Sequence, residues 1–184
     1  MEKFAWQKKP HRISNMSKSK SKGYRFECET AKKLSDWSGM NFVRVPASGA
    51  LRWNNDETWI YGDVLPPANI PIVVECKFHA NISLENLLRE DSKIIEWWKQ
   101  CEADSERAND NLRIDSQPVV IFRRNQTPSK IMMREEFFQD VMFGTEPDLV
   151  RAFAFYNMGP NLVVADLDSF LAGVTVDRMI EYFS

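Results

Sequence analysis

The segment Pro71-Ile72-Val73-Val74-Glu75-Cys76-Lys77-Phe78 decides how this chain is interpreted. Its β-branched and aromatic residues predict a strand. Successive side chains of a strand point to opposite faces, so Glu75 and Lys77 project together and Cys76 lies on the other face. The strand therefore presents an acid and an amine side by side.

Two further acids lie in predicted elements upstream of this strand. Residues Tyr61 to Leu65 predict a short strand that pairs with it as a hairpin and carries Asp63. Residues Gly23 to Trp37 have apolar side chains at helical spacing, and Gly39 is placed to end that helix. Glu27 lies on its half-buried flank, where a carboxylate needs a cation, a hydrogen-bond donor or a metal.

These residues suit metal-dependent phosphodiester cleavage. Asp63 and Glu75 are hard oxygen ligands that would hold Mg²⁺, or Mn²⁺, with the Cys76 carbonyl as a third ligand and Glu27 bound directly or through water. Lys77 would orient or deprotonate the attacking water, or stabilise the pentacovalent phosphate. A Glu and a Lys two apart on an exposed strand are more often a solvated pair, but the apolar strand and the helix acid favour a site.

The order of these motifs resembles the PD-(D/E)xK nuclease superfamily. More narrowly, it is similar to archaeal-type Holliday junction resolvases and related phage nucleases over residues 18 to 124. The motifs are Lys22-Gly23-x-x-x-Glu27, Phe42-Val43-Arg44-Val45-Pro46-Ala47-Ser48-Gly49, Asp63-Val64 and Val74-Glu75-Cys76-Lys77. The resemblance implies a restriction-endonuclease-like mixed central β-sheet flanked by helices.

The resemblance also implies roles for further residues. Ser48 would lie by the scissile phosphate, Arg44 would be a basic residue of the preceding strand, and Gln100 would lie behind the active site. The family typically acts as a homodimer that nicks opposed strands of a four-way junction. The chain departs from the compact pattern by a long aromatic segment at 51–61 and by about 60 residues after Arg124. Asp56 or Glu57 of that segment could replace Asp63, although a solvated loop is the more ordinary interpretation.

Charge is unevenly distributed along the chain. The net charge of the 184 residues is -2, but residues 1–25 contain six Lys and two Arg against one Glu. We expect residues 1–22 to form a flexible basic arm that contacts a polyanion or merely aids solubility. The candidate DNA-binding residues are Lys18, Lys20, Lys22, Arg25, Arg44, Arg52 and Gln100.

Composition predicts one nuclease domain at residues 23–184, with a core at about 23–124 and a C-terminal extension at 125–184. Three cysteines without C-x-x-C spacing and two histidines indicate neither a disulfide framework nor a structural zinc site. No segment has the ~18 apolar residues that span a bilayer, so a cytoplasmic protein without membrane contact is expected.

The remaining pattern predicts an α/β (α+β) domain with helices packed on a mixed sheet. A helix is expected from Leu84 to about Arg107, with a break or N-cap near Asp91. Strands are expected at 119–122, 130–133, 151–156 and 162–165, and helices at 135–143 and 169–183.

Three functions remain open from sequence. The first is a Mg²⁺-dependent structure-selective DNA endonuclease, a junction resolvase acting on branched DNA. The second is a restriction-type or repair-type nuclease of the same fold that cuts duplex DNA. The third is a non-catalytic DNA-binding module, whose measurable behaviour would not change in Asp63→Ala.

Overall fold

A seven-stranded mixed sheet forms the centre of the computed structural model, which describes residues 18–46, 61–82, 92–144, 150–155 and 161–184. The strand order is β1-β2-β3-β4-β5-β7-β6. Strands β3 and β4 run parallel, and the other neighbouring pairs run antiparallel. The strands are β1 (Val43–Arg44), β2 (Val64–Leu65), β3 (Ile72–Phe78), β4 (Gln117–Arg123), β5 (Lys130–Arg134), β6 (Ala152–Phe155) and β7 (Leu162–Asp166).

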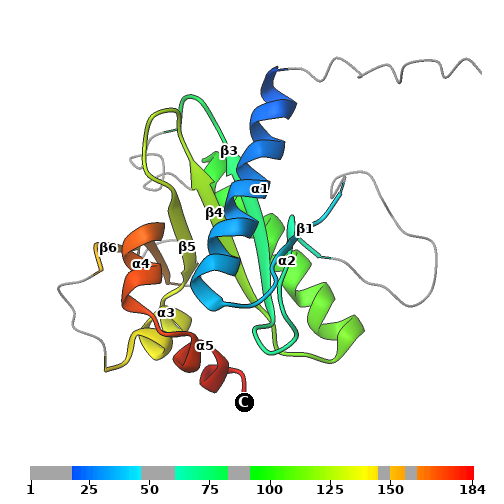
Figure 1. Ribbon diagram of the computed structural model, residues 1–184, viewed down its shortest axis with the longest axis vertical. Coiled ribbons are helices and arrows are strands. Elements are labelled where there is room, and N and C mark those ends of the chain that lie inside the picture. Colours follow the sequence, from blue (N-terminus) through cyan, green and yellow to red (C-terminus); the bar gives the residue numbers. More distant parts are fainter. Residues whose placement is uncertain (1–17, 47–60, 83–91, 145–149, 156–160) are drawn as a thin grey trace, which may run out of the picture.

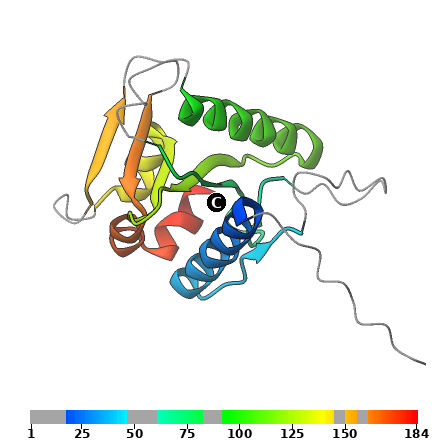
Figure 2. The same ribbon diagram turned by 90° about the horizontal axis from the view of Figure 1, so that it is seen from above.

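Helices cover both faces of this sheet (Figure 1). One face packs against α2 (Lys93–Leu112). The other packs against α1, α3, α4 and α5, so the sheet lies between α1 and α2 when seen from above (Figure 2). The bounds of these helices are α1 (Lys18–Ser38), α3 (Glu135–Met142), α4 (Leu167–Gly173) and α5 (Val176–Tyr182). The predicted α/β (α+β) class, a restriction-endonuclease-like mixed central sheet flanked by helices, is confirmed.

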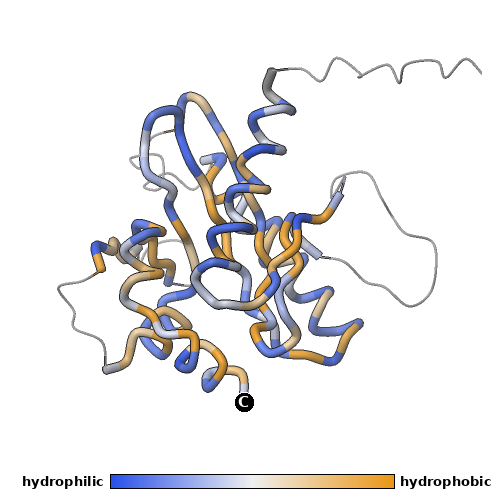
Figure 3. The backbone as a smooth tube through the Cα atoms, in the orientation of Figure 1, coloured by the Kyte–Doolittle hydropathy of each residue, from blue (hydrophilic) through white to orange (hydrophobic). Residues whose placement is uncertain are grey.

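Two buried clusters separate at strand β3, as its alternating pattern predicts. Val74 belongs to the cluster beneath α1, and Val73 belongs to the cluster beneath α2. The hydropathy of the chain follows the same plan, with apolar segments in the central strands (Figure 3). No helix of the described ranges is both long and apolar enough to cross a membrane.

Helix α1 begins at Lys18, five residues before the predicted start at Gly23. The last part of the predicted flexible arm is therefore helical, because lysine is a good helix former and one glycine is tolerated. The predicted end is correct, since the Gly39 N–H donates to the Ser35 carbonyl at 2.9 Å. The interior face holds Phe26, Thr30 and Leu34 at the predicted spacing.

Two other helix predictions need correction. Helix α2 has its N-cap at Ser92, whose Oγ accepts the Ile95 N–H at 3.4 Å, in agreement with the N-cap predicted near Asp91. The helix continues to Leu112, beyond the predicted end near Arg107, while the predicted start at Leu84 lies outside the described residues. The single helix predicted over 169–183 is two helices. The break lies before Thr175, whose side chain accepts the Arg178 N–H at 3.3 Å and begins α5.

The turn before β2 brings two backbones unusually close. Gly62 has φ +75°, and a Cβ at this position would lie 2.5 Å from the Val74 carbonyl oxygen of β3. Gly39 has a similar φ of +67°, but a Cβ there would meet nothing within 4 Å. The two glycines thus share a backbone conformation and differ in the space around them.

Gly62→Ala should destabilise the protein far more than Gly39→Ala. Both variants carry the strain of a left-handed backbone, about 1 kcal/mol, and Gly62→Ala adds overlap with β3 that should cost about 2 kcal/mol more. Urea unfolding of both variants beside wild type measures the free energies. Equal reductions in stability would contradict the close approach of Gly62 to Val74.

Candidate active site

Asp63 is held at the start of the β2–β3 pairing. Its N–H donates to the Val74 carbonyl at 2.7 Å, and its carbonyl accepts the Val45 N–H at 2.9 Å. The predicted hairpin is confirmed by the antiparallel pairing of Val64 with Val74. The Asp63 carboxylate is buried, and its Oδ2 accepts the Cys76 N–H at 2.9 Å. The acid is therefore fixed against the middle of β3.

Glu75 and Lys77 project from β3 towards α2. The Lys77 ammonium donates to Glu75 Oε1. Gln100 of α2 completes the group, because its Nε2 lies 3.4 Å from Glu75 Oε1 and its Oε1 lies 3.4 Å from Lys77 Nζ. The predicted shared face of Glu75 and Lys77 is confirmed, and Gln100 contacts both side chains from α2.

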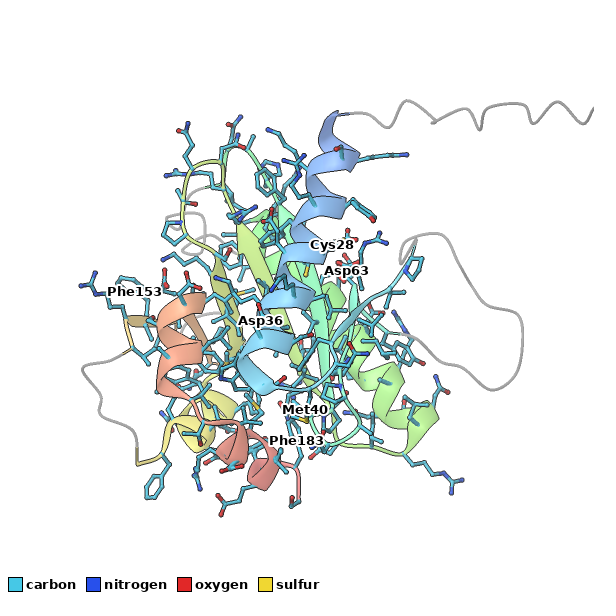
Figure 4. All side chains as sticks on the ribbon, in the orientation of Figure 1. Cys28, Asp36, Met40, Asp63, Phe153 and Phe183 are labelled. Atoms are coloured by element: carbon cyan, nitrogen blue, oxygen red, sulfur yellow. The ribbon has the colours of Figure 1, made fainter. Side chains whose placement is uncertain are left out.

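Glu27 approaches the same region from α1. Arg44 of β1 donates from Nε to Glu27 Oε2 at 2.7 Å, and its guanidinium stacks 4.3 Å above the Tyr24 ring. Burial and the charge of Asp63 raise the pKa of Glu27, while Arg44 lowers it. Figure 4 shows Asp63 beside α1, level with Cys28, the residue that follows Glu27. Helix α1 and the β2–β3 hairpin thus bring a third acid to the site.

Burial and neighbouring charge both oppose ionisation of Glu75. Burial, with the charge of Asp63 second, raises the pKa of Glu75 to about 7, against the stabilising effect of Lys77. Asp104 of α2 adds a smaller contribution of the same sign. A carboxyl that is this reluctant to ionise is stabilised by an added cation. The site is therefore short of positive charge without a bound ion.

The donor set fits a hard divalent cation. Among the described residues, no three Asp, Glu, His or Cys side chains stand close enough to form a metal cluster. Mg²⁺ does not need one, because it is commonly held by one or two carboxylates, with water and substrate phosphate as the other ligands. Asp63 and Glu75 can supply the carboxylates. The Cys76 thiol is unsuited to the task, since burial raises its pKa well above the usual value, so only its carbonyl stays a candidate.

The other predicted residues have different positions. Lys20, Lys22 and Arg25 lie on the N-terminal half of α1, ahead of Glu27 along the helix. Lys18 begins α1, and Ser48 and Arg52 lie outside the described residues, as do Asp56 and Glu57.

Sequence reasoning missed two neighbours of the carboxylates. Tyr24 stacks on Arg44, and Asp104 acts on Glu75 from one turn beyond Gln100. The spacing of Gln100 and Asp104, four apart on one helix, was the available signal for the second.

The raised pKa of Glu75 predicts how stability depends on pH in the metal-free protein. Between its usual value of 4.5 and about 7, the unfolded chain loses this proton before the folded chain does. The free energy of unfolding should therefore fall as pH rises through this window. Glu75→Gln should flatten that fall in urea titrations with EDTA from pH 5 to 8. Glu102→Gln, at a half-buried acid paired with Arg134, is the control, and a wild-type slope in Glu75→Gln would contradict the prediction.

Comparison with known proteins agrees with this geometry. A family model described as "Phage putative PDDEXK endonuclease" matches residues 18–180. Protein D14 of Escherichia phage T5 is 31% identical over an alignment of 114 positions that covers 59% of this chain, and the chain spans 66% of the length of this curated relative. No solved structure matches. Because the family model covers most of the chain, including every element of the site, this protein belongs to the phage PD-(D/E)xK endonuclease family.

Proposed function

We propose that this protein is a Mg²⁺-dependent, structure-selective DNA endonuclease that makes paired nicks in four-way junctions. The observation that supports it most is the buried pair of Asp63 and Glu75 with the Lys77 ammonium beside them. Family membership makes the protein a nuclease of the PD-(D/E)xK type. The preference for junctions rests on the resolvase-like order of its motifs and is the finer part of the proposal.

Asp63 and Glu75 would hold the divalent ion, with Mn²⁺ as an alternative to Mg²⁺. When bound, such an ion supplies Lewis-acid chemistry, acidifying water and neutralising charge on the phosphate. The Cys76 N–H donates to Oδ2 of Asp63 and so orients this carboxylate at the middle of β3. Glu27, held by Arg44, would act through water at the edge of the site.

Lys77 would act on the reacting phosphate, and Gln100 would position Lys77. The Lys77 ammonium lies beside Glu75, where it can stabilise charge that builds on the phosphate oxygens during attack by water. Gln100 contacts both side chains and holds the pair in register, which makes it a positioning residue. Among the roles open to Lys77, charge stabilisation agrees best with its ion pair.

Cleavage of a labelled immobile four-way junction beside its linear duplex arms tests the proposal. Mg²⁺ should support paired symmetric nicks on the junction, and EDTA should abolish them. Asp63→Asn should lower the rate at least about 100-fold, while Asp36→Asn, at an exposed acid paired with Lys32, should not. Equal cutting of the duplex would favour a restriction-type or repair-type nuclease. Binding without any cutting would favour the non-catalytic module.

Removal of the Lys77 ammonium should slow chemistry more than binding. Lys77→Gln should reduce the single-turnover cleavage rate about 100-fold and leave junction affinity in EDTA within about twofold. Lys130→Gln is the matched control, because Lys130 is also a half-buried lysine paired with an acid, Asp166. Equal reductions in rate and in affinity for Lys77→Gln would show that this residue only binds DNA.

We also propose that the active form is a homodimer. Two opposed nicks within one binding event require two active sites, and each chain provides one carboxylate group. Nicks that appear one at a time, from a protein that sediments as a monomer with bound junction, would contradict this part.

A further inference from the structure

A second cluster of positive charge lies on a pair of aromatic rings at the end of β3 and β4. The rings of Phe26 and Phe78 pack edge to face, with centroids 6.0 Å apart. The Arg123 guanidinium lies 4.7 Å from the Phe26 centroid and 5.3 Å from that of Phe78. Lys22 Nζ lies 5.7 Å from the same Phe78 ring. Two cations therefore share one aromatic support.

This cluster lies on the flank of α1 opposite to the carboxylates. Lys22 and Glu27 are five residues apart, which places them about 140° apart around a helix of 3.6 residues per turn. Their contacts agree, since Glu27 bonds to Arg44 of β1 and Lys22 bonds to Asn125 after β4. Figure 1 shows α1 crossing the sheet between β1 on one side and the turn after β4 on the other.

The cluster carries more positive charge than its acid partners neutralise. Lys22 bonds to the uncharged Asn125 at 3.3 Å, and Arg124 has no ion pair with any residue in the described ranges. Glu29, an exposed acid of α1, pairs with Arg123 at 2.7 Å. Because the net charge of the whole chain is -2, an overall excess of basic residues does not explain this local positive charge. The turn after β4 and the start of α1 are also hydrophilic (Figure 3).

We propose that these four residues, Lys22, Glu29, Arg123 and Arg124, form a ledge that binds the backbone of duplex DNA away from the scissile phosphate. The inference rests on the proposed function and extends it to how the substrate is held. A guanidinium stacked on two rings is ordered in advance, and its planar donors match the oxygens of a phosphate. Glu29 then serves as a resident counterion that a DNA phosphate replaces.

The ledge and the carboxylates contact different phosphates. Five residues of α1 span about 7.5 Å along the helix axis, at 1.5 Å per residue. The ledge lies in addition on the other flank, so one phosphate cannot occupy both places. DNA held at both places passes over the N-terminal half of α1.

The salt dependence of junction binding in EDTA tests the ledge without any need for cleavage. Lys22→Gln and Arg124→Gln should each make the slope of log affinity against log salt shallower by about 0.9, because one duplex phosphate is no longer neutralised by the protein. Arg113→Gln removes the same charge from an exposed position at the C-cap of α2, at the opposite end of β4 from Arg123, and should leave the slope unchanged. Arg123 itself is left intact in these variants because it packs on Phe26 of the core.

Glu29→Gln gives a result of opposite sign. Removing the resident counterion should tighten junction binding about two- to fivefold at low salt. Glu181→Gln is the matched control, since Glu181 is also an exposed acid paired with an arginine, Arg178, that lies over a phenylalanine ring. A purely electrostatic gain from the removal of one negative charge would appear equally in both variants.

Shallower slopes for Lys22→Gln and Arg124→Gln alone, with tighter binding for Glu29→Gln alone, would support the ledge. Wild-type slopes in both Lys22→Gln and Arg124→Gln would overturn the ledge. Changes of equal size in the control variants would also overturn it. If these failures occur in a protein that still cuts the junction with Mg²⁺, the proposed function survives without the ledge. A wild-type protein that neither binds nor cuts DNA would overturn both.

Discussion

The hydrogen bond from the Asp63 N–H to the Val74 carbonyl, 2.7 Å long, is the interaction on which the carboxylate site depends. It joins β2 to β3 directly after Gly62 has passed against the Val74 backbone. Because the pairing involves a strand of only two residues, few other backbone bonds hold the register. A shift of one residue would turn every β3 side chain to the opposite face. Glu75 and Lys77 would then point away from α2 and into the apolar cluster beneath α1.

The same hydrogen bond brings the acids close together in a buried region. Each acid has a different counterpart: a backbone N–H for Asp63, the Lys77 ammonium for Glu75 and the Arg44 guanidinium for Glu27. Even so, burial and Asp63 leave the pKa of Glu75 at about 7. Buried carboxylates with incomplete compensation lower stability, and such arrangements are concentrated at functional sites. The packing of β3 and β4 over seven paired positions offsets that cost in this fold.

The regular alternation of side-chain direction along a strand made part of this structure predictable. The alternation along β3 placed Val73 and Val74 in different clusters, and Glu75 with Lys77 on one face, as expected. Helix ends were less predictable, because local alternatives have similar energies. Ser92 and Asp91 are both good N-caps, and Thr175 interrupts a pattern that is otherwise helical.

Side-chain partners from distant segments could not be inferred from sequence. The pairing of Glu27 with Arg44 depends on how β1 lies against α1, and that placement follows from packing across the whole sheet. The same holds for the partners of Arg123. Its position above Phe26 and Phe78 exists only because α1 and β4 meet there.

Helix α1 links the two charged regions mechanically. Phe26 is almost fully buried and anchors the helix to the sheet, while its ring also supports the Arg123 guanidinium at 4.7 Å. Glu27, the next residue, extends towards Asp63 on the other flank. Any force that moves α1 on the sheet therefore moves both the support of Arg123 and the carboxylate of Glu27. Because protein interiors are close-packed, such a movement cannot be absorbed locally. The seating of one helix thus sets the geometry of both regions at once.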